Sequence, residues 1–298
     1  AVTGQDSYDA NGNMAYDPSK GINVYYNLLN LPRQVQFGAN DNVRYTWDAN
    51  GVKLAKVAEG ANAQNNVRTD YSGNFLYENS SLMSILTPYG RIIPFNNNGS
   101  VLYMYEYNQT DHLGNVRATF TAHSNGKPET NQITSYDPFG FVTKQDNWYA
   151  PIILKNRYLY NGKEIQNDVL AGTSLDWYDY GARMYDAVLG RWHSVDPLAE
   201  KAYDWSTYRY GFDNPVGFID PTGMWETDFG VTKGGYVKQI GQTNNDPDRL
   251  FVIDEKNIRL DINRDGSISG KDYIQINNKT ILPNLSIVNT IDSKNVSK

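Results

Sequence analysis

The residues with the clearest spacing for chemistry lie near the C-terminus, in the segment DINRDGSISGKD (residues 261–272). Gly266 stands at the sixth position of this segment, where a calcium loop of the EF-hand or dockerin type needs a sharp turn. The alternative is a plain β-hairpin, because Asn-Arg-Asp-Gly is a strong turn and Asp replaces the bidentate Glu at the last position. Ca²⁺ is therefore the one cofactor that the sequence suggests, and its candidate ligands are Asp261, Asn263, Asp265, Ser267 (through its carbonyl) and Asp272.

Other catalytic side chains are scarce in residues 225–298. This stretch contains neither His nor Cys, which excludes His-metal nuclease, Ser-His-Asp and Cys-His chemistry within it. Its neighbouring acids Asp254 and Glu255 would face opposite ways on a strand. The three histidines of the chain are far apart in sequence, and structural roles are expected for them. They are His112, His123 and His193.

A repeated turn in the sequence predicts the secondary structure that positions the candidate residues. The pattern is Tyr or Trp followed by Asp-x-x-Gly, or a close variant, at intervals of roughly 24 residues or twice that. Asp or Asn followed by Gly reverses the chain between two strands, as in a stack of hairpins. The turns begin near Tyr8, Trp47, Asp70, Asp111, Tyr136, Tyr160 and Tyr185.

Between the turns, apolar and polar residues alternate, which predicts strands. The predicted strands include INVYYNLL, VRYTW, VLYMYEY and KNRYLYNG. The best helical candidate is short, DPLAEKAY (residues 196–203), with Asp as N-cap and Pro at the first helical position. After Gly223 the repeat stops and the tail again reads as strands, so we place a boundary between Met224 and Trp225.

Composition agrees with a β-rich protein and excludes several classes. The chain has 298 residues, with 23 Tyr, 25 Gly and no Cys, so disulfides and thiol chemistry are excluded. The formal charge of −6 and the lack of a basic stripe argue against nucleic acid as a partner. No apolar run is long enough for a membrane span. The first residue is Ala and no signal peptide follows, which suggests a processed chain or a fragment.

Several of these segments together resemble the Rhs/YD-repeat proteins, and more narrowly the Rhs repeat-associated core of the type found in Bacteroidetes. They are DHLGNVRATF, YDPFGFV, YNGKEIQND, WYDYGARMYDAVLGRW and NPVGFIDPTGM. The match is specific over residues 111–224, looser over 6–59 and absent from 225 onward. The resemblance implies a YD-repeat-like β segment (1–110), the core that caps a β-strand shell (111–224) and a variable C-terminal module (225–298), often a toxin.

The resemblance also implies chemistry at the end of the core. Some members of the family cut themselves there through an aspartyl-protease-like site, after the Leu of an Asp-Pro-x-Gly-Leu motif. The corresponding residues are Asp220-Pro221-Thr222-Gly223-Met224, in which Met replaces Leu at similar volume. The scissile bond implied by position is Met224–Trp225.

Such a reaction needs two carboxylates close enough to share a proton, one to activate water and one to assist the carbonyl. Asp196 is the first candidate, with Asp186 or Asp220 as the second, and Arg191 could hold one carboxylate ionised through a bidentate pair. The structural alternative is that Asp-Pro and Asp-x-x-Gly are ordinary turns, with Pro at the second position and Asp capping the bend.

These observations lead to a mainly β chain, a fragment of a YD-repeat shell with its capping core and a small β-rich C-terminal module. Its expected role is to encase, present or release a C-terminal effector outside the cell or at its surface, with self-cleavage as an associated activity. The expected partners are the rest of the shell, its own C-terminal module and secretion or surface machinery. Two alternatives stay open: an adhesion module that binds glycan or protein through Tyr-rich faces, and a toxin enzyme in the tail.

Overall fold

The computed structural model describes residues 7–60, 66–122, 127–148, 155–201 and 203–224, together with five strand segments farther along the chain. The chain divides into two compact units, residues 1–195 and 196–298. The prediction of a mainly β protein is confirmed. The predicted boundaries at residues 110 and 224 stay predictions. Among the described residues, no helix is long and apolar enough to cross a membrane.

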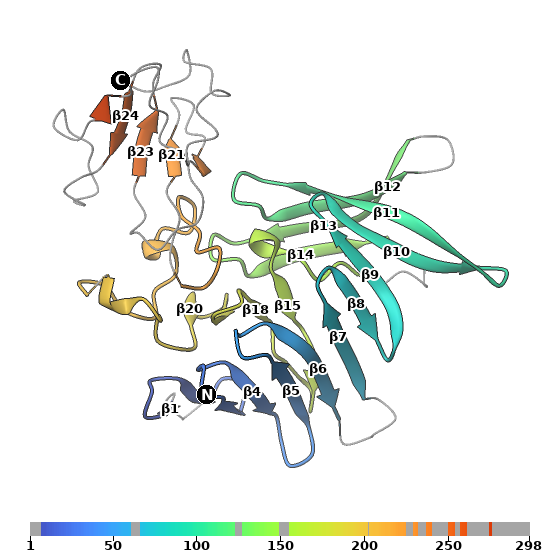
Figure 1. Cartoon of the computed structure of the whole chain (residues 1–298), viewed down its shortest axis with the longest axis horizontal. Coiled ribbons are helices and arrows are strands. Elements are labelled where there is room, and N and C mark those ends of the chain that lie inside the picture. The colour runs from blue at the N-terminus through green and yellow to red at the C-terminus, as the bar shows by residue number, and fades with distance from the viewer. Residues whose placement is uncertain are drawn as a thin grey trace. The chain divides into compact units, whose positions relative to one another are not determined.

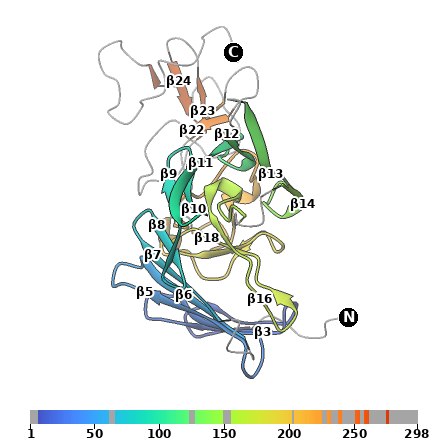
Figure 2. The ribbon, with the colours of Figure 1, turned by 90° about the vertical axis from the view of Figure 1, so that its right-hand side faces the viewer.

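The first unit is built on one antiparallel sheet of 14 strands, in which each strand pairs with its neighbours in the sequence. The sheet curves around the segment that follows it, as Figure 1 and Figure 2 show from two directions. Its strands are β1 (Ser7–Tyr8), β2 (Met14–Asp17), β3 (Ile22–Tyr26), β4 (Pro32–Gln36), β5 (Asn42–Trp47), β6 (Lys53–Glu59), β7 (Val67–Ser72), β8 (Phe75–Glu78), β9 (Ser81–Thr87), β10 (Gly90–Asn97), β11 (Ser100–Thr110), β12 (Val116–Ala122), β13 (Pro128–Tyr136) and β14 (Val142–Asn147).

The repeated turns share one hydrogen-bond pattern, seen at Asp9, Asp48 and Asp111. The backbone N–H of each Asp donates to the carbonyl four residues later at 2.8–3.0 Å, and the Gly three residues later donates back to the Asp carbonyl at 3.0–3.2 Å. One carboxylate oxygen accepts from the backbone N–H groups two and four residues farther on. Glycine is required because the backbone is left-handed there, with φ of +80° or +81° at Gly12, Gly51 and Gly114.

Residues 155–195 form a small body inside the curve of the sheet. Four strands make a second sheet, in the order β15 (Glu164–Gln166), β18 (Trp177–Asp179), β19 (Met184–Asp186) and β20 (Arg191–Trp192). A hairpin of β16 (Val169–Leu170) and β17 (Thr173–Ser174) forms a separate two-stranded sheet. We call residues 155–195 the inner segment.

The predicted strand over residues 155–162 is wrong for most of its length. Tyr158 forms a single β-bridge to Glu164, and Tyr160–Gly162 is a 3-10 turn. The physical reason is the Asn161–Gly162 pair, whose φ angles of +48° and +67° are left-handed and incompatible with a strand.

The sheet and the inner segment share one apolar core. Buried residues of β2 to β6, such as Ile22, Val35 and Val43, pack in the same cluster as Leu175 and Trp177 of the inner segment. At the other end of the sheet, three tyrosines of the inner segment form hydrogen bonds to the turn between β13 and β14. The hydroxyl groups of Tyr160, Tyr178 and Tyr185 donate to the backbone carbonyls of residues 138, 140 and 139 at 2.7–3.1 Å.

The second unit begins with loops and two 3-10 turns, Ala199–Lys201 and Gly211–Asp213. The helix predicted over residues 196–203 is therefore only a 3-10 turn at Ala199–Lys201. The described strands of the tail are β21 (Phe229–Val231), β22 (Val237–Gln239), β23 (Leu250–Ile253), β24 (Asn257–Leu260) and β25 (Ile274–Gln275), in one sheet of order β22-β21-β23-β24-β25. The last four overlap strands predicted from the sequence, whereas β21 was not predicted.

Candidate functional site

The predicted junction is organised by Asp220, which is fully buried. One oxygen of its carboxylate, Oδ1, accepts the backbone N–H groups of Thr222 at 3.2 Å, Gly223 at 2.7 Å and Met224 at 3.1 Å. Gly223 has a left-handed φ of +72°. The Asp-Pro-Thr-Gly-Met sequence is thus a tight turn capped by its own aspartate, and this turn fixes the backbone as far as the predicted scissile bond. Trp225 lies outside the described residues.

Asp196 belongs to the same unit and is also buried. Its Oδ1 accepts the N–H of Leu198 at 2.8 Å, and its backbone N–H donates to the carbonyl of Thr207 at 3.1 Å. The Asp-Pro pair therefore caps the short 3-10 turn and ties it to a second loop. Two of the predicted catalytic carboxylates, Asp196 and Asp220, are thus buried turn residues of one unit.

Asp186 and Arg191 belong to the other unit, where they are opposite one another across β19 and β20. The Arg191 side chain is exposed, and the carboxylate of Asp186 pairs instead with the ammonium of Lys20, at 2.5 Å. Trp177 also donates its indole N–H to Asp186 at 3.1 Å. Burial alone would raise the pKa of Asp186, but His193 and Lys20 outweigh this effect and hold it well below its usual value.

His193 lies beside this ion pair and is fully buried. Its Nε2 is 3.7 Å from Asp186, beyond hydrogen-bond distance, and its ring packs on Trp177 with centroids 3.9 Å apart. Neither ring nitrogen has a hydrogen-bond partner among the described residues. Burial therefore lowers the pKa of His193, although Asp186 partly opposes the shift. His193 is thus a buried residue of the core, and the structural role expected for it stays a prediction.

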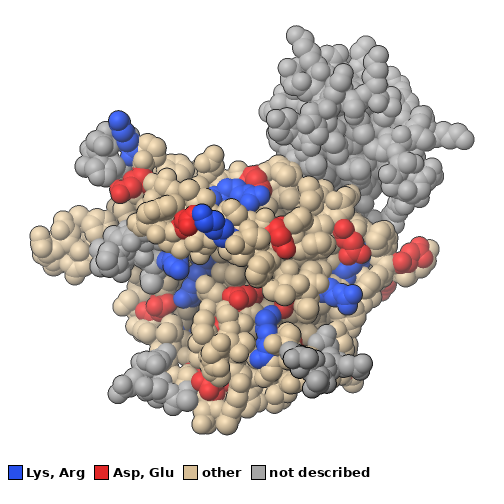
Figure 3. Space-filling view, turned by 180° about the vertical axis from the view of Figure 1, so that it is seen from behind, with Lys and Arg blue, Asp and Glu red and all other residues tan. Residues whose placement is uncertain are grey.

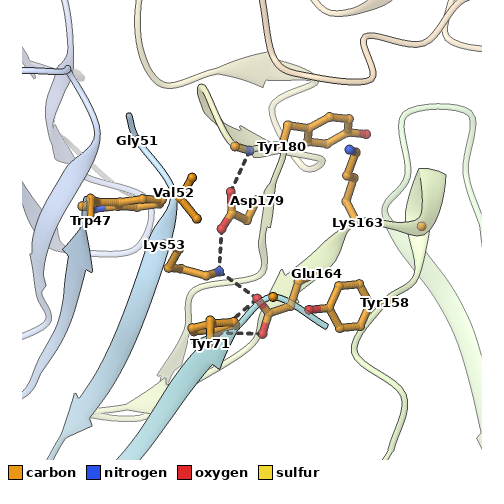
Figure 4. A pocket seen from close by; sticks show the side chains of 13 residues that line it. Trp47, Gly51, Val52, Lys53, Tyr71, Tyr158, Lys163, Glu164, Asp179 and Tyr180 are labelled. Carbon is orange, nitrogen blue, oxygen red and sulfur yellow. Dashed lines mark hydrogen bonds and ion pairs between the residues drawn. The ribbon is translucent and has the colours of Figure 1, made fainter. Parts of the chain in front are cut away.

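A cluster that the sequence did not predict lies on the other side of the inner segment, around Lys53 of β6. Its ammonium donates to Asp179 at 2.5 Å and to Glu164 at 2.7 Å, and the hydroxyl of Tyr71 donates to both oxygens of Glu164 at 3.0 and 3.1 Å. Figure 4 shows Lys53 pointing between the two carboxylates, with the hydroxyl of Tyr158 directed toward Glu164.

The charges of this cluster are strongly coupled. Burial opposes ionisation of both groups, but Lys53 outweighs it at Glu164, whose pKa falls to about 2. Asp179 and Glu164 likewise raise the pKa of Lys53 despite its burial. Glu164 and Lys53 are therefore both charged near neutral pH. No local sequence pattern marks this cluster, because Lys53 is 111 residues from Glu164 and 126 residues from Asp179.

A cavity of about 420 Å³ opens beside the cluster. Aromatic, charged and turn residues of β5 to β7 and of the inner segment line it. They include Trp47, Val52, Tyr71, Tyr158, Lys163 and Tyr180. The arrangement can hold a small ligand by hydrogen bonds and ring contacts.

Two other features bear on ligands. Within residues 7–224, apart from the gaps given above, no group of three or more His, Cys, Asp or Glu could hold a metal ion. The predicted calcium loop, residues 261–272, lies outside the described residues, so Ca²⁺ stays a prediction. On the face in Figure 3, Lys and Arg are interspersed with Asp and Glu over the described part of the surface.

Comparison with known sequences finds relatives that are much longer than this chain. The chain is 30% identical over 228 residues to the tRNA3(Ser)-specific nuclease WapA of Bacillus spizizenii, covering 74% of this chain and 9% of that protein. It is 28% identical over 231 residues to the tRNA nuclease WapA of Bacillus subtilis, with the same two coverages. Salivary gland surface protein 1 of Aedes aegypti is 33% identical over 96 residues, 31% of this chain and 2% of that protein. No family model matches the chain.

Comparison with solved structures finds the same β fold in a toxin complex. The crystal structure of TcdB2-TccC3 matches with a TM-score of 0.54 and 23% identity over 72% of this chain and 11% of that chain. The Photorhabdus luminescens Tc holotoxin pore, with a TccC3 mutation, matches with a TM-score of 0.53 and 23% identity over 73% of this chain and 10% of that chain. The chain thus spans about a tenth of the length of the WapA proteins and of the matched TccC3-containing chains, and 2% of the Aedes aegypti protein.

Proposed function

We propose that this chain is the terminal part of an Rhs/YD-repeat shell that encases, presents or releases a C-terminal effector. The observation that carries the proposal is the match of about three quarters of the chain to WapA and to the TcdB2-TccC3 complex, with the 14-stranded sheet curved around the inner segment. In this proposal the curved sheet contributes shell wall, and residues 225–298 are the cargo or its leading segment.

The partners follow from this arrangement. They are the remaining part of the shell, the C-terminal module and the secretion or surface machinery of a bacterial cell, and the location is outside the cell or on its surface. The nuclease activity named for WapA belongs to that protein. In this chain, residues 225–298 lack His and Cys, so a nuclease there would have to use other groups.

Residues 225–298 would be released by hydrolysis of the Met224–Trp225 peptide bond within the same chain. One carboxylate takes a proton from water, the resulting hydroxide adds to the Met224 carbonyl, and the second carboxylic acid supplies a proton as the C–N bond breaks. The products are a carboxylate at Met224 and an amine at Trp225. Asp196 and Asp220 are the candidates best supported by burial and by their shared unit, with Asp186 and Arg191 as the remaining candidates.

The test is the intact mass of the purified chain under denaturing conditions at neutral pH, with N-terminal sequencing of any fragment. A fragment that begins at Trp225 supports self-cleavage, and the variants Asp196→Asn and Asp220→Asn should then stay whole. Asp48→Asn is the matched control, because Asp48 also caps a turn through its carboxylate but belongs to the other unit. A fragment that begins at Pro221 indicates acid lability of the Asp-Pro bond instead, and a single uncut chain contradicts self-cleavage.

A further inference from the structure

The hairpin of β10 and β11, the longest of the 14-stranded sheet, extends past the strands on either side of it (Figure 1). β10 pairs with β9 only over Gly90–Ile92, and β11 pairs with β12 only over Glu106–Thr110. Residues 93–104 therefore pair only with one another. We call residues 93–104 the hairpin arm. Among the described residues, neither edge of this arm is paired with a further strand.

The two edges of the hairpin arm differ in their backbone groups. In an antiparallel pair, every second residue directs its N–H and C=O away from the partner strand. The N–H of Asn108 donates to the carbonyl of Tyr89 at 2.8 Å, and alternation from this pair directs the backbone groups of Val101 and Tyr103 to the outer edge of β11. By the same alternation Pro94 faces the outer edge of β10, where it has no N–H to donate. The edge that is open to a further strand is thus that of β11.

The surface around this edge carries no exposed charge. Residues 79–110 contain only two charged side chains, Arg91 and Glu106, which are both buried and pair with each other at 2.8 Å. Val101, Leu102 and Tyr103 of the hairpin arm are instead 59%, 42% and 57% exposed. Edge strands are normally protected from pairing by lysine, by other charges or by proline. The β11 edge of the arm has none of these, so it is suited to pair with another strand.

The chemistry of the hairpin arm favours a second copy of this chain as the partner. An uncharged edge offers no electrostatic attraction to a charged protein or to anionic lipid. A bilayer would also have to accept the polar tip of the arm first, which is Asn-Asn-Asn-Gly-Ser (residues 96–100). Two copies of an uncharged strand meet without repulsion, and two identical antiparallel strands are related by a two-fold axis, the commonest symmetry of homo-oligomers.

We propose that the hairpin arms of two copies pair through their β11 edges to form a symmetric dimer. A register centred on Leu102 places Val101 opposite Tyr103 of the partner subunit. The outward N–H and C=O groups of these residues then bond to each other, and an aromatic side chain lies beside a β-branched one on the same face. The proposal is independent of encasement and of cleavage.

The paired edge is short, which sets the expected strength of the dimer. Residues 100–104 span about 17 Å at about 3.3 Å per residue. Contacts of this size belong to the weak, reversible interfaces that bury less than about 1,200 Å². We therefore expect a dimer Kd on the order of 100 μM.

Sedimentation velocity of the full chain from about 5 to 500 μM measures this equilibrium. The average mass should rise with concentration from 33.7 kDa toward twice that value. Tyr103→Lys places an ammonium group at the edge of each copy and should weaken dimerisation more than tenfold. Tyr25→Lys is the matched control, because Tyr25 is also an exposed tyrosine of a strand but lies on β3.

A disulfide locates the contact. The chain has no Cys, so Leu102→Cys introduces a single thiol at the centre of the proposed register. Opposed residues of this kind have Cα atoms about 4.5 Å apart, which is within the range that a disulfide can bridge. Oxidation by diamide, which takes up the two electrons and two protons of the thiols, should give a covalent dimer on a non-reducing gel. Leu54→Cys, at an equally exposed leucine of β6, should stay monomeric.

Three results would overturn the inference. The first is a monomer mass at every concentration up to about 500 μM; if that monomer floats with phosphatidylcholine vesicles, the hairpin arm binds membranes instead. The second is dimerisation that Tyr103→Lys weakens no more than Tyr25→Lys does. The third is cross-linking of Leu54→Cys as readily as of Leu102→Cys.

Discussion

A turn capped by an aspartate side chain occurs in two settings in this molecule. At Asp48, on the sheet, one carboxylate oxygen accepts two backbone N–H groups at 2.8 Å and the side chain is partly exposed. At Asp186, on the inner segment, one oxygen again accepts two backbone N–H groups, at 2.8 and 3.2 Å. Its other oxygen is buried against Lys20 and the indole of Trp177.

The comparison shows how an aspartate that caps a local turn can also form a contact with a distant part of the chain. The turn itself needs only one oxygen of the aspartate, so a repeat sequence can use it anywhere. In the inner segment the second oxygen joins residues 166 positions apart in the chain. A buried charge of this kind is costly to leave without its partner, whereas an exposed one is readily solvated.

The largest expected effect on stability is that of removing the Asp186 carboxylate, compared with removal of the Asp48 carboxylate. Asp186→Ala leaves Lys20 and its surroundings without a counter-charge, and we expect a loss of about 3–5 kcal/mol in the free energy of unfolding. Asp48→Ala removes only a turn cap and should cost about 1 kcal/mol. Urea unfolding followed by circular dichroism measures both. Equal losses would show that the buried second oxygen of Asp186 adds nothing to the free energy of unfolding.

A second test compares two turn glycines. A Cβ at Gly140 would lie 2.5 Å from the ring of buried Tyr160, whose hydroxyl is anchored to the backbone, and φ is +93°. Gly21 has φ of +64°, and nothing lies within 4 Å of its Cβ position. We expect Gly140→Ala to cost about 3 kcal/mol and Gly21→Ala about 1 kcal/mol. The comparison fails if the two thermal midpoints fall equally.

The smallest effect is the response to acid. The folded pKa of Glu164, about 2, lies below its ordinary value of 4.5, so its stabilising contribution is present above pH 4.5 and is lost as pH falls toward 2. At pH 3.5 the loss is about 1 kcal/mol. His193 acts in the same direction at higher pH: its folded pKa is lowered from 6.5, so stability also declines as pH falls below 6.5.

Unfolding curves at a series of pH values measure this acid response. The variant Glu164→Gln should show a shallower decline between pH 4.5 and 2 than the unaltered chain. Glu59→Gln is the matched control, because Glu59 pairs with the exposed Arg44 at 3.4 Å. An identical slope for all three proteins would contradict the role assigned to Glu164.

Much of the sheet could be predicted because its signals are local. Asp and Gly set the turn through hydrogen bonds that span four residues, and alternation sets the strands between turns. The same alternation wrongly predicted a strand over residues 155–162, because the left-handed backbone at Asn161 and Gly162 is incompatible with a strand. Asp196 and Asp220 could be singled out from their Asp-Pro pairs, and both are buried turn residues.

The Lys53 cluster could not be predicted in this way. A lysine at the start of an ordinary strand carries no local mark of its partners, and the two carboxylates follow it by more than one hundred residues. The buried Arg183, whose guanidinium lies 4.2 Å from the centre of the Trp192 ring, was missed in favour of the exposed Arg191. Burial is decided by how the sheet curves, which composition and periodicity do not encode.

The strictly sequential order of the 14 strands has a kinetic consequence. Each strand pairs only with its neighbours in the chain, so the sheet can form hairpin by hairpin as the polypeptide emerges, with short loops to close at each step. The ion pairs Lys20–Asp186, Lys53–Glu164 and Lys56–Asp168 join residues more than one hundred positions apart, so we expect them to form after the strands pair. Until then, the inner face of the sheet is exposed.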